Sequence, residues 1–67
     1  MDEMHRLTWS DWNTLVAWCR EHRPGLLLCA IQARECVMYR TYRGVRRVYR
    51  SRAAPVIVAF QAWALAS

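Results

Sequence analysis

Between Met38 and Arg50, basic and apolar side chains separate onto two faces only if the chain is helical. At about 100° per residue, five arginines and Tyr39 fall on one side of a helix, and the remaining apolar, aromatic and hydroxyl side chains fall on the other. The arginine side consists of Arg40, Arg43, Arg46, Arg47 and Arg50. If the chain instead formed a β-hairpin turning at Arg43 and Gly44, neither face would be apolar. The pattern therefore favours a helix, which we expect over residues 26–52.

The N-terminal third carries signals for a separate helix over residues 9–22. Thr8 and Asp11 have the spacing of a capping box, in which each side chain bonds to the backbone N–H of the other residue. Apolar side chains then recur at helical spacing and predict one buried stripe. They are Trp9, Trp12, Leu15, Val16 and Cys19. The helix should end at Arg23, because a residue before proline avoids the α conformation and Gly25 favours a turn.

Pro55 and Gly44 set the remaining boundaries that the sequence predicts. Proline is favoured at the first position of a helix, so a last helix is expected over residues 55–66. Gly44 costs roughly 1 kcal/mol relative to alanine inside a helix, so the 26–52 helix would break there if it is divided. We therefore predict one all-α domain over residues 1–67, arranged as a small helical hairpin or as three helices.

A second fold class stays open for the middle of the chain. Valine and tyrosine favour strands, and the segment around Gly44 resembles a hairpin turn. The alternative to the all-α fold is therefore an α+β fold in which residues 36–42 pair with residues 45–51.

The chain has more apolar side chains than so short a domain can bury. Of its 67 residues, 55% are apolar and four are tryptophan, whereas a domain of this size buries only about 60% of the surface that its unfolded chain exposes. We therefore expect a partner protein, a membrane surface or a second copy to cover part of this surface, and we predict a homo-oligomer. The residues assigned to the core or to such an interface are Trp9, Trp12, Leu15, Val16, Tyr42, Val45, Tyr49, Phe60 and Trp63.

The C-terminal segment is uncharged from Ala53 to Ser67 but too short to cross a bilayer. About 15 residues at 1.5 Å each extend roughly 22 Å, less than the ~30 Å of the hydrocarbon core. The N-terminus lacks the basic and apolar regions of a signal peptide. Together with three cysteines that we expect to stay reduced, these features predict a cytoplasmic protein.

No arrangement of side chains in the sequence indicates catalysis or metal binding. Cys19 and His22 stand one helical turn apart, but no third group orients them as a nucleophile and base. Cys29 and Cys36 on one helix would lie about 10 Å apart along its axis, too far to share a zinc ion. The five acids are scattered, and two glycines cannot form a phosphate-binding loop. We therefore predict neither an enzyme nor a protein with a metal or cofactor.

The arginine side of the predicted middle helix is the candidate binding surface. Residues 1–24 carry four acids and three arginines, whereas residues 25–67 carry seven arginines and one acid. Arginine binds carboxylates and phosphates through a planar fork, and it is typical of interfaces. The predicted partner-binding residues are Arg40, Arg43, Arg46, Arg47, Arg50 and Tyr39.

Three kinds of partner fit this surface, in order of preference. The first is an acidic patch on a larger protein, which the chain would regulate or inhibit. The second is nucleic acid, bound through its phosphates without sequence specificity. The third is an anionic membrane surface, with residues 56–65 inserted. A face that meets only solvent is the simplest alternative, but such a face usually mixes charges of both signs.

Overall fold

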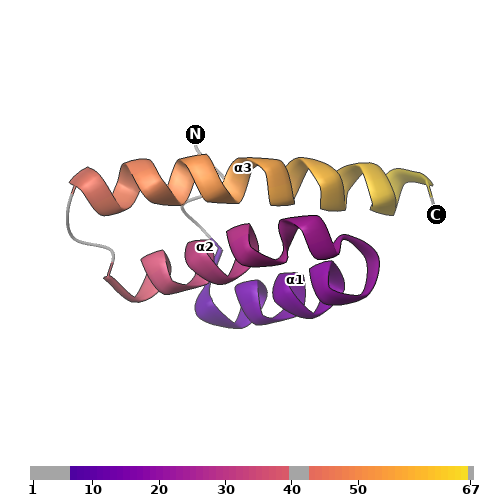
Figure 1. Ribbon diagram of the computed structural model, residues 1–67, viewed down its shortest axis with the longest axis horizontal. Helices are drawn as coiled ribbons and strands as arrows, with labels where there is room; N and C mark the ends of the chain where they lie inside the picture. The colour runs from indigo at the N-terminus through magenta and orange to yellow at the C-terminus, as the bar shows by residue number, and fades with distance from the viewer. Residues whose placement is uncertain (1–6, 40–42, 67) are drawn as a thin grey trace.

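The chain folds into three α-helices that pack side by side in a computed structural model, which describes residues 7–39 and 43–66 (Figure 1). The helices are α1 (Trp9–His22), α2 (Leu27–Tyr39) and α3 (Arg43–Ala66), and a short 3-10 helix, η2 (Pro24–Leu26), joins the first two. Successive helices run in opposite directions, and α2 lies between α1 and α3 in this view. The described residues contain no strand, so the all-α prediction is confirmed, and the parts of the alternative hairpin that they include are helical.

α1 begins and ends where the sequence predicts. The Asp11 amide donates a hydrogen bond to Thr8 Oγ1 (3.2 Å), and the Thr8 amide donates one to Asp11 Oδ2 (2.9 Å), which completes the capping box. The backbone hydrogen bond from Thr8, followed by the one from its hydroxyl, lowers the pKa of the Asp11 carboxyl. At the other end, the Arg23 amide donates to the Cys19 carbonyl oxygen (2.8 Å), and Pro24 begins η2.

The predicted boundaries of the second helix are wrong. The 26–52 helix of the prediction is divided, because α2 ends at Tyr39 and a new helix begins at Arg43. Gly44, the predicted point of division, lies inside α3. α2 and α3 are described up to Tyr39 and from Arg43, and residues 40–42 lie outside the described part of the chain.

α3 continues through Pro55, contrary to the prediction of a separate 55–66 helix. Proline has no N–H, so the Ser51 carbonyl oxygen loses its helical hydrogen bond. Ser51 and Pro55 are both exposed, so water can replace that bond. Ala53 and Val56, on either side of the proline, are fully buried. Their packing in the core holds the helix together across this position.

The core forms where small residues let the helices approach and aromatic residues fill the remaining space. Ala30 and Ala33 on α2 and Ala53 on α3 are fully buried. The other core residues are Trp12, Leu15, Val16, Trp18, Cys19, Tyr49 and Val56. The rings of Trp12 and Tyr49 meet edge to face at 6.0 Å, and this pair links α1 to α3.

A second aromatic cluster joins the C-terminal parts of α1 and α3. Trp18 lies edge to face on Phe60, with ring centroids 5.2 Å apart. Trp63 lies 5.7 Å from Trp18 and 5.1 Å from His22. The Arg23 guanidinium lies 6.0 Å from the centre of the Trp18 ring. This cluster holds the charge-free part of α3 against α1 and leaves the opposite side of α3 to solvent.

Candidate interaction surface

Four described arginines are exposed on the N-terminal half of α3, and one of them, Arg52, lies in a groove beside α2. Arg46, Arg47 and Arg50 lie within little more than one helical turn, and we refer to them as the arginine face. α3 carries five arginines in all and neither an aspartate nor a glutamate between its first and last residue. The charges that α3 itself contributes are therefore all positive.

The other predicted binding residues are placed differently. Tyr39 is exposed, but it is the last residue of α2 and so lies on another helix than the arginines. Arg43 is the first residue of α3, and its side chain lies outside the described part of the structure. Arg40 and Tyr42 also lie outside the described residues. The arginine face is therefore defined by Arg46, Arg47 and Arg50 alone.

Most of the apolar residues predicted for the core or an interface pack inside this chain. Those that are buried or half-buried are Trp12, Leu15, Val16, Val45, Tyr49 and Phe60. Trp9 and Trp63 are each more than one-third exposed. Trp63 nevertheless belongs to the aromatic cluster, and the guanidinium of Arg34 lies over the Trp9 ring at 5.0 Å. Little of the predicted apolar set therefore remains for a partner.

Val58 and Leu65 form an exposed apolar end of α3 that the sequence pattern did not single out. Their side chains are 64% and 88% exposed. Val58 follows Arg47 by 11 residues and Leu65 by 18, which is close to three and five full turns, so the three side chains face the same way. This spacing indicates a shared side only if one helix continues through Pro55. Because the sequence pattern predicted a new helix at Pro55, it did not align Val58 and Leu65 with the arginines.

Arg34 holds α1 and α2 together and does not belong to the arginine face. It donates a hydrogen bond from Nη1 to Asn13 Oδ1 (2.7 Å) and stacks over Trp9. Its Nε is buried and has no hydrogen-bond partner among the described residues. The guanidinium is therefore committed to packing between two helices.

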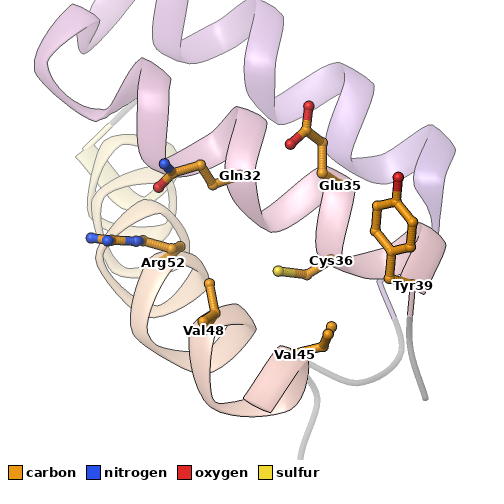
Figure 2. Close-up of a pocket in the computed structure, with 7 residues that line it drawn as sticks. All are labelled: Gln32, Glu35, Cys36, Tyr39, Val45, Val48 and Arg52. Carbon is orange, nitrogen blue, oxygen red and sulfur yellow. The ribbon is translucent and has the colours of Figure 1, made fainter. Parts of the chain in front are cut away.

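A small open groove lies between α2 and α3 (Figure 2). Its lining residues are Gln32, Glu35, Cys36, Tyr39, Val45, Val48 and Arg52. Its volume, about 230 Å³, is below the roughly 300–1,000 Å³ of typical small-molecule sites. Burial, followed by the charge of Glu35, raises the pKa of the Cys36 thiol and so disfavours the reactive thiolate. Neither the size of the groove nor its thiol favours catalysis.

The Cys19 and His22 pair on α1 is also unsuited to nucleophilic chemistry. Cys19 is fully buried, and burial followed by the neighbouring Cys29 raises the pKa of its thiol. The His22 ring stacks on Trp18 at 6.1 Å. The pair therefore serves packing in this arrangement.

The described residues hold neither a metal-binding cluster nor a helix suited to crossing a membrane. Within residues 7–39 and 43–66, no three histidine, cysteine, aspartate or glutamate side chains lie close enough to hold a metal ion. Of the helices described, none combines the length and the apolar character needed to span a membrane. No protein family, curated protein or solved structure shows a significant match to this chain.

Proposed function

We propose that this protein is a small non-enzymatic binding protein that regulates or inhibits a larger protein by docking on an acidic surface of it. The arginine face supports this most directly, because its three exposed side chains lie close together on a helix that contains no acid. The planar guanidinium of arginine forms paired hydrogen bonds with carboxylates, so an acidic protein surface matches it in geometry as well as in charge.

The arginine face would act mainly on the rate and the specificity of docking. Exposed ion pairs contribute little to affinity, typically about 0–1 kcal/mol each. Complementary charge nevertheless accelerates encounter and disfavours partners of the wrong sign. Affinity must therefore come from apolar contacts, and Val58 and Leu65 are exposed on the same side of α3.

Nucleic acid is the second candidate partner, because the arginine face also suits phosphates. Phosphate binding would use the charges alone, and it assigns no role to the exposed apolar residues at the other end of α3. An acidic protein surface accounts for both features, so we prefer it.

Capture of a partner from the native host tests the proposal. Nuclease-treated lysate would be passed over the tagged full-length chain and over an Arg47→Gln variant. The matched control is Arg20→Gln, which removes one exposed arginine from α1. We expect an identifiable protein with an acidic surface that the wild type and the control retain and that Arg47→Gln retains less. An Arg46→Gln/Arg47→Gln variant should weaken retention further.

The same variants separate the candidate partners. Equal retention of every captured protein by wild type and the arginine variants would contradict the proposal. Nucleic acid would replace it if nuclease abolished capture and if affinity for duplex DNA fell steeply between about 50 and 200 mM salt. In that case Arg46→Gln/Arg47→Gln should also weaken DNA binding.

A further inference from the structure

We infer that the exposed side of α3 is a docking surface in two parts, which fits a protein partner that carries an acidic patch and, about 16–27 Å from it, an apolar recess. The inference rests on the proposed function. It assigns the acidic patch to the arginine face and the recess to Val58 and Leu65, which we call the apolar end. The spacing of these residues on α3 sets the distance between the acidic patch and the recess of the partner.

The arginine face and the apolar end meet on one side of a continuous helix at Arg47, while Arg50 and Arg46 are rotated by about 60° and 100° from it around the axis. Arg47, Val58 and Leu65 are separated by nearly whole numbers of helical turns. At 1.5 Å per residue, Val58 lies about 16 Å and Leu65 about 27 Å from Arg47 along the axis. Ser51 and Ala54, which lie between them, have short side chains that leave this side of the helix accessible. One partner surface of ordinary size can therefore reach both parts.

The apolar end is not needed by the core of this chain. Val56 is fully buried and Phe60 packs on Trp18, whereas Val58 and Leu65 are mostly exposed. Burying one exposed apolar side chain of this size in a partner strengthens binding by about tenfold or more. The apolar end can thus supply the affinity that the arginines alone do not.

Among the described residues, a second copy of this chain offers no matching acidic patch. The acids in the described residues are Asp11, Glu21 and Glu35. Asp11 and Glu21 lie about 15 Å apart along α1, and Glu35 is on α2. Asp11 is further engaged in the capping box. With a net charge of +5 on each copy, the arginine face would meet repulsion rather than complementary charge.

A bilayer also fits the surface less well than a protein does. Helices that lie in a membrane interface carry basic and apolar residues on opposite sides. α3 carries them at opposite ends of one side and uses its other side for the core. Tilting α3 to insert Leu65 would lift Arg47 from the headgroups by up to about 27 Å, well beyond the screening length of about 8 Å. A protein surface can present an acidic patch and a recess at two separate points.

Synthetic helical peptides provide a defined probe. The first carries a glutamate cluster and a pair of leucines about 16–27 Å further along. The second has alanines in place of the leucines. Each peptide is made in two versions, with the glutamate cluster either N-terminal or C-terminal to the leucine or alanine pair. Binding to the full-length chain would be measured by calorimetry. We expect the leucine peptide, in one of its two orders, to bind about tenfold more tightly than its alanine counterpart.

Paired variants locate the source of that difference. Val58→Gln/Leu65→Gln should lose the tenfold gain. Val48→Gln/Leu28→Gln makes the same two changes at exposed positions in the groove and on α2, and it should keep the gain. Circular dichroism of each variant verifies that the helices are retained.

Each remaining outcome separates this inference from the proposed function. If arginine variants weaken peptide binding but Val58→Gln/Leu65→Gln keeps the tenfold difference, the two-part surface is wrong and the proposed function stands. If arginine variants leave binding unchanged, the proposed function fails. The two-part surface is also overturned if vesicles containing phosphatidylglycerol bind more tightly than the peptides through Val58 and Leu65. A dimer in sedimentation that dissociates in Val58→Gln/Leu65→Gln would overturn it equally.

Discussion

Trp12 on α1 donates a hydrogen bond from Nε1 to the Oη of Tyr49 on α3, over 3.3 Å and between residues 37 positions apart in the sequence. Both side chains are buried, and their rings meet edge to face. This pair therefore joins the first helix to the helix that carries the proposed docking surface.

Removing the hydroxyl of this pair should destabilise the protein. Tyr49→Phe keeps the ring contact but leaves Trp12 Nε1 buried without its acceptor, which we expect to cost about 1–3 kcal/mol. Urea denaturation would measure the loss. In a double-mutant cycle with Trp12→Phe, the second substitution should cost less than it does alone. Additive losses, or no loss in Tyr49→Phe, would show that the hydrogen bond contributes nothing.

Two valines of α3 should respond very differently to truncation. Val56 is fully buried and Val58 is mostly exposed, while both stand in the same helix two residues apart. Val56→Ala should lower the free energy of unfolding by about 2 kcal/mol, because two buried methyl groups are lost. Val58→Ala should change it by less than about 0.5 kcal/mol. If thermal or urea unfolding showed similar losses of stability for the two variants, the burial of Val56 and the exposure of Val58 would both be contradicted.

Replacing the proline inside α3 should stabilise the protein. Proline costs about 3 kcal/mol relative to alanine in the interior of a helix, and part of that gain is offset because alanine makes the unfolded chain more flexible. We therefore expect Pro55→Ala to raise the free energy of unfolding by about 1–2 kcal/mol. If Pro55 were instead the first residue of a separate helix, the substitution would be neutral or destabilising. Chemical denaturation distinguishes the two cases.

The capping box should make stability depend on pH in the acid range. Because folding lowers the pKa of Asp11, its contribution is complete above the unfolded pKa, near 4 for aspartate, and is lost as the pH falls through the folded value. Asp11→Asn should therefore show a weaker fall in stability below about pH 4 than the wild type. Thr8→Ala, which removes the hydrogen-bonding hydroxyl, should flatten the same slope. Urea titrations at several pH values would measure the free energy of unfolding as a function of pH. If the slopes of the variants below about pH 4 equal that of the wild type, Asp11 is not the group responsible.

Short-range patterns were sufficient for part of the fold and of the candidate surface. The boundaries of α1 follow from Thr8, Asp11 and Pro24, which act on backbone groups within one turn. The helical character of residues 43–52 follows from basic and apolar residues that recur every three to four positions. Arg46, Arg47 and Arg50 could therefore be assigned to a helix face from the sequence alone.

The course of α3 depends on contacts that the sequence does not display. A proline usually marks a helix start, but the burial of Ala53 and Val56 on either side of Pro55 compensates for the lost hydrogen bond. Without that continuity, Val58 and Leu65 have no defined direction relative to the arginines.

The sequence by itself determined where the first helix lies and that the basic charge is concentrated in the second half of the chain, and it favoured an all-α fold over the α+β alternative. Only the tertiary structure decided that α2 ends at Tyr39 and α3 begins at Arg43, that α3 is one helix, and that its exposed side carries Arg47, Val58 and Leu65. Capping and periodicity act over one or two turns, and those can be deduced from neighbouring residues. Whether a helix survives a proline depends on which side chains a distant helix buries, and that is settled only when Trp12, Tyr49 and their neighbours come together.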